Sequence, residues 1–172
     1  LQDIRTFRAV IEGTGCACAF DEPANELRVD PSGFHSAEAP YDLVRKMRAS
    51  FYMLGALAGR CGQAKVSLPG GCAWGPRPVD LHLKGLQAMG YHIRQEAGYI
   101  LLDGPDRLPA ASFTLEPSSV GATVNLLLAS VTRSERFTIR NAALEPDVVQ
   151  LCRALQSMGA DIDGVGSTTL VV

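Results

Sequence analysis

Apolar residues recur at the spacing of an α-helix in five stretches of the chain. These stretches cover residues 3–13, 41–60, 79–89, 119–131 and 146–158. The longest of them carries apolar side chains every three or four positions, which would form one stripe facing a core. The stripe consists of Leu43, Met47, Phe51, Leu54 and Leu57. The pattern therefore predicts an unbroken helix over residues 41–60.

Short runs of strand-favouring residues, separated by turn residues, lie between these helices. Three pairs of runs predict hairpins: residues 16–20 with 26–29, residues 91–95 with 99–103, and residues 160–163 with 168–172. Single strands are expected at residues 64–68, 112–115 and 137–140. This alternation of helices and strands indicates a mixed α/β fold.

An internal repeat organises these elements. Residues 86–93 read LQAMGYHI and residues 155–162 read LQSMGADI, while residues 10–17 are a fainter copy. In each copy a helix ends at a glycine and turns directly into a hairpin, as expected when glycine takes the left-handed position that closes a helix. Repeated units that each bury one face stack on a common core.

The repeat predicts three units, at about residues 1–38, 39–110 and 111–172. The second and third units have the order helix, strand, helix, strand, strand. The first unit lacks the opening helix and strand, so it is truncated relative to the other two. The expected architecture is a barrel-like α/β domain with a pseudo-threefold core, for which helices inside and sheets outside are one option.

The composition fits one domain with a substantial core, because 47% of the 172 residues are hydrophobic. The formal net charge of −2 gives no electrostatic reason to expect nucleic acid or an anionic membrane as a partner. No apolar stretch reaches the roughly 18 residues of a membrane helix. The first residues also lack the pattern of a signal peptide.

The five cysteines are odd in number and lack the spacing of a zinc site, so no metal is expected. Cys16 and Cys18 fall on one face of a strand, where we expect them to fill core space. This cysteine usage is typical of a reducing cytosol, and we interpret the protein as cytoplasmic.

A segment rich in glycine and proline, residues 68–80, separates a strand from a helix. Its glycines allow unusual backbone angles and its prolines remove amide donors, so it should project as a loop. Cys72 stands at the apex, Arg77 follows five residues later, and Pro78 lies near the first position of the next helix. Taken alone, such a loop is most often a surface connection that carries an incidental cysteine.

Four segments resemble the UDP-N-acetylglucosamine 1-carboxyvinyltransferases, which are enolpyruvyl transferases: residues 39–50, 67–83, 119–123 and 141–146. The resemblance covers essentially the whole chain. Its most specific part is residues 69–83, because a cysteine in that loop separates this group from most shikimate-pathway relatives. The resemblance implies two inside-out α/β domains of three units each. The chain resembles most of one domain, and the second is absent from it.

The resemblance implies transfer of the enolpyruvyl group of phosphoenolpyruvate to the 3-hydroxyl of UDP-N-acetylglucosamine, through a tetrahedral intermediate and without a cofactor or metal. This is the first committed step of peptidoglycan synthesis. Cys72 would protonate the methylene carbon or form a covalent adduct, since a thiol with a pKa of about 8.5 is largely protonated at neutral pH. Arg77 and Arg48 would bind carboxylate or phosphate. The antibiotic fosfomycin would target Cys72.

Two helix starts would form the nucleotide side of the site, because backbone N–H groups at a helix N-terminus suit a diphosphate. The expected substrate-binding residues are Arg48, Arg77, Pro78, Val79, Asp80, Leu81, Ser119, Val120 and Gly121. Ser119 should also cap its helix. The histidines His35, His82 and His92 receive no role, because a lone histidine is more often packed than catalytic.

The chain departs from the resembling family at Trp74, Pro76 and Pro117, where family members carry a smaller residue, an alanine and, in some members, a lysine. The family's Lys-Asn pair that meets phosphoenolpyruvate has no counterpart here. Two alternatives therefore stay open. One is a shikimate-3-phosphate enolpyruvyl transferase, against which the Cys72 loop argues. The other is a non-catalytic UDP-sugar-binding domain or fragment.

Overall fold

A computed structural model describes residues 2–44, 47–69 and 79–172, with only the backbone of Arg48 described at that position. The helices within these ranges are α1 (Gln2–Glu12), α2 (Tyr41–Val44), α3 (Met53–Cys61), α4 (Asp80–Met89), α5 (Val120–Ser130) and α6 (Pro146–Ser157). Two short 3-10 helices are η1 (Pro31–Gly33) and η2 (Arg48–Tyr52). The predicted helices over residues 3–13, 79–89, 119–131 and 146–158 are confirmed to within a few residues.

The prediction of one unbroken helix over residues 41–60 is wrong. The chain instead forms α2, η2 and α3, and Met47 takes an extended backbone with φ −146° and ψ 125°. The separate start of α3 is stabilised from outside, because the Asn125 side chain on α5 accepts a hydrogen bond from the Gly55 amide at 2.7 Å. The apolar spacing correctly identified Phe51, Leu54 and Leu57 as buried. Burial alone does not require them to share one helix.

The described strands form three separate sheets and do not close into the barrel-like form that we expected. Their bounds are β1 (Ala17–Asp21), β2 (Glu26–Asp30), β3 (Glu38–Ala39), β4 (Gln63–Ser67), β5 (His92–Glu96), β6 (Tyr99–Asp103), β7 (Ala111–Thr114), β8 (Phe137–Arg140) and β9 (Thr169–Val171). The sheet orders are β1-β2, β3-β4-β6-β5 and β7-β8-β9. In each larger sheet, one parallel pair (β3 with β4, β7 with β8) adjoins an antiparallel pair (β4 with β6, β8 with β9).

The first two predicted hairpins are confirmed as β1-β2 and β5-β6. The third, over residues 160–163 and 168–172, is reduced to a single bridge between Asp163 and Val171. The backbone of β9 is occupied elsewhere, because β9 pairs along its length with β8. Gly90 and Gly159 close their helices with positive φ, as the repeat predicted, whereas in the fainter copy Gly15 rather than Gly13 has this conformation.

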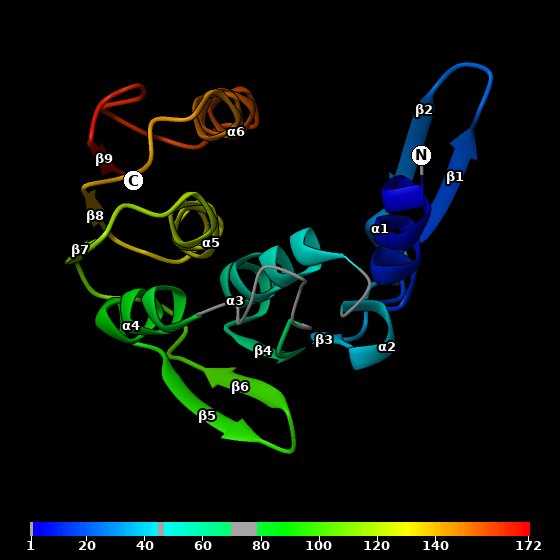
Figure 1. The fold of residues 1–172 in the computed structure, drawn as a ribbon, viewed down its shortest axis with the longest axis horizontal. Helices are drawn as coiled ribbons and strands as arrows, with labels where there is room; N and C mark the ends of the chain where they lie inside the picture. The colour runs from blue at the N-terminus through cyan, green and yellow to red at the C-terminus, as the bar shows by residue number, and fades with distance from the viewer. Residues whose placement is uncertain (1, 45–46, 70–78) are drawn as a thin grey trace.

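Helices α3, α4 and α5 lie on the inside of the molecule, and the two larger sheets lie toward its outer margin (Figure 1). Helix α5 is the most enclosed element, since every one of its side chains from Gly121 to Leu127 is buried. Two glycines allow α3 to approach it closely: a Cβ on Gly55 would lie 2.3 Å from the Asn125 carbonyl oxygen, and one on Gly59 would lie 2.4 Å from that of Leu128.

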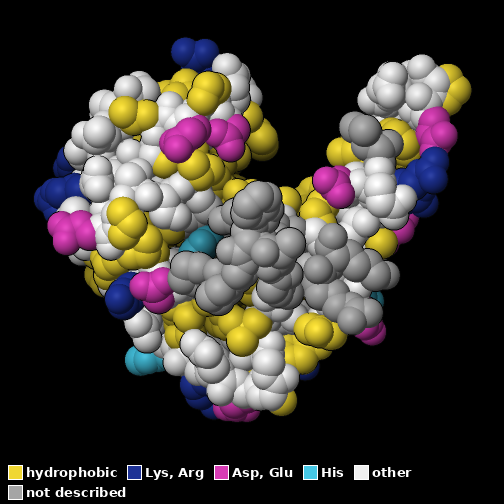
Figure 2. All heavy atoms as spheres, in the orientation of Figure 1, with side chains coloured by type: hydrophobic (Ala, Val, Ile, Leu, Met, Phe, Trp, Pro, Cys, Tyr) yellow, Lys and Arg dark blue, Asp and Glu magenta, His cyan; other side chains and the backbone are white. Residues whose placement is uncertain are grey.

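The N-terminal elements α1, β1 and β2 form an arm that stands apart from the lobe containing α5, α6 and the β7-β8-β9 sheet (Figure 1). In the space-filling view a hollow opens between this arm and that lobe (Figure 2). Apolar side chains of α1 and η2 border this hollow.

No helix within the described residues is long and apolar enough to cross a membrane.

Candidate functional site

The N-terminus of α5 is built by its capping residue. The Ser119 side-chain oxygen accepts a hydrogen bond from the Ala122 amide at 3.3 Å, which confirms the predicted cap. The Ser119 carbonyl accepts both the Thr123 amide at 2.9 Å and the Thr123 hydroxyl at 2.8 Å. This first turn therefore has a fixed geometry, and Val120 and Gly121 stand at its open end.

The N-terminus of α4 supplies the second helix start. Asp80 is the first helical residue and is exposed, with its carboxylate 3.5 Å from the Lys84 ammonium one turn on. The Val79 carbonyl accepts the Leu83 amide at 3.1 Å, and the side chains of Val79 and Leu81 pack against the core. Asp80 is thus the outward-facing member of the predicted group Val79 to Leu81.

His82 connects the two helix starts. It lies in the first turn of α4 with 7% of its surface exposed, and its ring meets Phe51 edge-on with centroids 5.2 Å apart. A Cβ placed on Gly121 would lie 3.0 Å from His82 Cε1 and 3.2 Å from Nε2, so the ring edge packs directly on the backbone of α5. The expectation of a packed histidine is confirmed, and its packing partner is a predicted substrate-binding residue.

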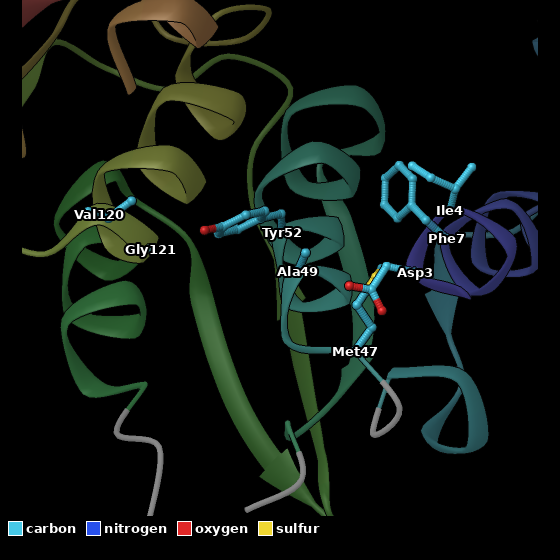
Figure 3. A pocket seen from close by; sticks show the side chains of 8 residues that line it. All are labelled: Asp3, Ile4, Phe7, Met47, Ala49, Tyr52, Val120 and Gly121. Atoms are coloured by element: carbon cyan, nitrogen blue, oxygen red, sulfur yellow. The ribbon is translucent and has the colours of Figure 1, made fainter. Parts of the chain in front are cut away.

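A cavity of about 610 Å³ opens beside the α5 N-terminus. Its walls come from three elements: α1, η2 with the residue before it, and α5 (Figure 3). The lining residues are Asp3, Ile4, Phe7, Met47, Ala49, Tyr52, Val120 and Gly121. The Tyr52 ring points across the cavity toward α5, and Ile4 and Phe7 face it from α1 (Figure 3). Its walls are mainly apolar, with the Asp3 carboxylate and the Tyr52 hydroxyl as polar groups.

The structure brings together only part of the predicted site. Val79, Asp80, Leu81, Ser119, Val120 and Gly121 are described, and the α4 and α5 starts meet through His82. The predictions for Cys72, Arg77 and Pro78 lie outside the described residues, as does the Arg48 side chain. The cavity residues Tyr52, Ile4 and Phe7 were missed, because they come from segments distant in sequence and carry no local motif.

The described cysteines differ in burial, and burial changes the pKa of some of their thiols. Cys152 is buried, as predicted, and its burial raises the pKa of its thiol. Burial also raises the pKa of Cys61 and of Cys18. The prediction that Cys16 and Cys18 fill core space is wrong: both are half-buried, and no residue of β1 or β2 is buried. Among the described residues, no group of three or more His, Cys, Asp or Glu side chains could hold a metal ion.

A family comparison decides the classification. The family model described as EPSP synthase (3-phosphoshikimate 1-carboxyvinyltransferase) matches residues 1–172. The chain belongs to the EPSP synthase family. Its fold agrees with this assignment: the chain superimposes on the enolpyruvyl transferase NikO from Streptomyces tendae with a TM-score of 0.80 and 27% identity, covering 98% of this chain and 39% of NikO. An EPSP synthase from Acinetobacter baumannii shares the fold, with a TM-score of 0.73 and 16% identity over 99% of this chain and 39% of that one.

Within the EPSP synthase family, curated relatives named UDP-N-acetylglucosamine 1-carboxyvinyltransferase are similar along the entire chain. The relative from Chlorobaculum parvum is 50% identical over 100% of this chain and 40% of its own length. The relative from Hydrogenovibrio crunogenus is 47% identical over 100% of this chain and 41% of its own length. These matches confirm the resemblance found in the sequence. The chain spans about two fifths of the length of these relatives.

Proposed function

We propose that this chain is part of an enolpyruvyl transferase that transfers the enolpyruvyl group of phosphoenolpyruvate to the 3-hydroxyl of UDP-N-acetylglucosamine. The observation that carries the proposal is the 50% identity, over the whole chain, to a relative named for this substrate. This reaction would serve as the first committed step of peptidoglycan synthesis in the cytoplasm. The chain by itself would be inactive.

The two helix starts support a nucleotide-binding role. A helix N-terminus carries unpaired N–H groups and about half a positive charge, which favours a diphosphate. The starts of α4 and α5 adjoin through the His82–Gly121 contact, so both could face one ligand. In this proposal Val79, Asp80 and Leu81 receive the uracil and ribose, and the backbone at Ser119, Val120 and Gly121 approaches the diphosphate.

The chemical step is assigned to residues outside the described part of the chain. In the proposal the sugar hydroxyl loses its proton to water as its oxygen adds to the central carbon of phosphoenolpyruvate, and Cys72 donates a proton to the methylene carbon, which becomes a methyl group. The resulting tetrahedral intermediate then loses phosphate and a methyl proton to restore the enol double bond. Arg77 and Arg48 bind the carboxylate and phosphate charges. Fosfomycin would alkylate Cys72 in the complete enzyme.

We also propose the three-unit organisation at about residues 1–38, 39–110 and 111–172, with the opening helix of the first unit and the second domain outside this chain. The shared strand pairing of the two larger sheets supports the second and third units. The apolar cavity supports the absent helix: α1 carries Ile4, which is 37% exposed, toward a hollow bordered also by α5. A helix lying there would cover these apolar side chains.

Ligand titration of the 172-residue chain, followed by amide chemical shifts, tests the nucleotide site. UDP-N-acetylglucosamine should bind weakly and shift the amides of Val79 to Leu81 and Ser119 to Gly121. Uridine diphosphate should shift the same amide signals, and shikimate 3-phosphate should leave them unchanged. Shifts confined to the β1-β2 hairpin would place the site elsewhere. A response to shikimate 3-phosphate alone would favour the other substrate of this family.

A phosphate-release assay tests the proposed incompleteness of the chain. With phosphoenolpyruvate and UDP-N-acetylglucosamine, the purified chain should release no phosphate, because much of the cleft would lie outside it. Cys72→Ala serves as the matched control. Substrate-dependent turnover that disappears in the Cys72→Ala variant would show that the chain is a complete catalyst and would overturn this part of the proposal.

A further inference from the structure

Asn125 makes three hydrogen bonds from the centre of α5, where it is fully buried. Its Oδ1 accepts the Gly55 amide of α3 at 2.7 Å. Its Nδ2 lies 2.8 Å from His82 Nδ1 on α4 and donates to the Phe51 carbonyl of η2 at 3.4 Å. One side chain therefore joins four elements: α3, α4, α5 and η2.

The orientation of the Asn125 amide is determined by its backbone partners. The Gly55 amide can only donate, so it must face the amide oxygen, and the Phe51 carbonyl can only accept, so it must face the NH₂ group. Both requirements place Nδ2 next to His82. Since Nδ2 is a donor only, His82 Nδ1 must be an acceptor. A neutral histidine with an acceptor at Nδ1 carries its proton on Nε2.

The other edge of the imidazole faces the start of α5. A Cβ on Gly121 would contact His82 Cε1 and Nε2 at 3.0 and 3.2 Å, and Gly121 lines the cavity beside the proposed diphosphate position. The tautomer therefore decides whether the ring presents an N–H donor or a lone pair at this helix start. An N–H donor there carries a partial positive charge, as the helix N-terminus does, and so favours an anionic ligand. A lone pair would repel an anionic ligand.

We propose that Asn125 is a positioning residue that holds His82 as the neutral Nε2–H tautomer at the N-terminus of α5. Its effect on ligand binding rests on the proposed function, whereas the tautomer itself does not. Asn125 acts through His82, and it also fixes the relative position of α3 and α4, because its amide oxygen bonds to α3 and its NH₂ group bonds to α4.

Imidazole nitrogen shifts in the ¹⁵N-labelled 172-residue chain test the tautomer directly. The chain contains three histidines, so a His82→Gln variant assigns the signal of His82. The wild-type chain should show the proton on Nε2. Asn125→Asp keeps the size of the side chain and an acceptor for the Gly55 amide, but it replaces the NH₂ donor with a carboxylate oxygen. His82 should then carry a proton on Nδ1.

Ser130→Ala provides a matched control, because Ser130 is a buried polar residue on the same helix whose hydroxyl donates to the Leu127 carbonyl. It should leave the His82 nitrogen shifts unchanged. A wild-type Nδ1–H tautomer, or an unchanged tautomer in Asn125→Asp, would overturn the proposal. The wild-type measurement does not depend on Asn125→Asp, so it stands even where that variant fails to fold.

Affinity for UDP-N-acetylglucosamine tests the positioning role. Asn125→Asp should weaken binding about tenfold, the effect expected when one hydrogen-bond donor at a polar site is lost. Ser130→Ala should leave the affinity unchanged. Equal affinities in wild type and Asn125→Asp, despite a changed tautomer, would overturn the positioning role. An absence of binding in the wild type would instead overturn the proposed function, while the nitrogen shifts would still report the tautomer.

Discussion

Tyr91 is the titratable side chain for which burial has the clearest consequence. Its hydroxyl is enclosed and donates to the Ala58 carbonyl at 3.0 Å. Burial raises the pKa of Tyr91 to about 12, and the nearby Arg133 charge offsets only part of this. The folded protein therefore keeps this proton at a pH where the unfolded chain, with a tyrosine pKa of about 10, has begun to lose it.

The predicted consequence is a loss of stability between about pH 10 and pH 12. Above pH 10 the unfolded state binds fewer protons at this residue than the folded state, so the free energy of unfolding decreases as the pH rises. The total loss should be about 2–3 kcal/mol, because each pKa unit corresponds to about 1.4 kcal/mol. Denaturant unfolding at several pH values measures it.

Tyr91→Phe is the control for this prediction. It removes both the ionisable hydroxyl and its hydrogen bond, so the variant should be less stable at neutral pH by about 1 kcal/mol. Its stability should then change less than that of the wild type between pH 10 and 12. Parallel pH profiles for the two proteins would contradict the assignment of this stability loss to Tyr91.

Cysteine alkylation is the second prediction at the scale of residues. Cys152 should react most slowly, because it is buried and its raised pKa reduces the thiolate fraction. We expect Cys72 to react first, since its sequence context is a glycine-rich loop close to an arginine. Peptide mapping by mass spectrometry after brief treatment with a small alkylating agent gives the order. Faster labelling of Cys61 or Cys152 than of Cys72 would contradict the expected exposure of that loop.

At the scale of elements, the contact between α3 and α5 depends on small residues. The backbone of α5 passes so close to α3 that a Cβ on Gly59 would lie 2.4 Å from the Leu128 carbonyl oxygen. A backbone atom cannot rotate away, so relief requires the helices to separate. Gly59→Ala should therefore destabilise the protein by about 1–3 kcal/mol, despite the higher helix propensity of alanine.

Ala56→Gly is the matched control for Gly59→Ala, since it changes the same helix at a half-buried position. It lowers helix propensity without adding an atom and should cost about 1 kcal/mol. Chemical denaturation of both variants separates the two effects. A stabilised Gly59→Ala protein would show that helix propensity outweighs packing at this contact.

The elements could be predicted from sequence wherever the signal was local. Ser119 was identified as a cap because its side-chain bond reaches only three residues ahead, to Ala122. The break between α2 and α3 was missed because its stabilising partner, Asn125, lies 70 residues away from Gly55. The prediction of the third hairpin failed for a similar reason. β9 pairs with β8, and the local sequence pattern does not reveal this pairing.

At the scale of the whole molecule, the candidate site could be predicted only in part. The starts of α4 and α5 were named from helix signals and from the resemblance to a family. Their juxtaposition through His82 and Gly121, and the cavity wall supplied by α1 and Tyr52, follow from the packing of distant segments. No periodicity or spacing encodes such contacts, so they required the three-dimensional structure.

The weak burial of the arm formed by α1, β1 and β2 has a consequence for local unfolding of the protein. Only Thr6 and Val10 of α1 are buried, and no residue of β1 or β2 is, whereas α5 is almost entirely enclosed. Regions with little buried apolar surface open locally at a lower free energy than the core. The arm should therefore unfold locally as a cooperative unit of its own, while the rest of the chain stays folded.

Native-state hydrogen exchange measures this directly. Amides of the arm should exchange through a partial opening that leaves α3 and α5 protected, and their exchange should depend only weakly on denaturant. Amides of α5 should exchange only when the whole chain unfolds. Equal protection in the arm and in α5 would contradict a separate unit. A separate unit would make the arm the first part of this chain to become accessible to a protease, while the helical interior stays folded.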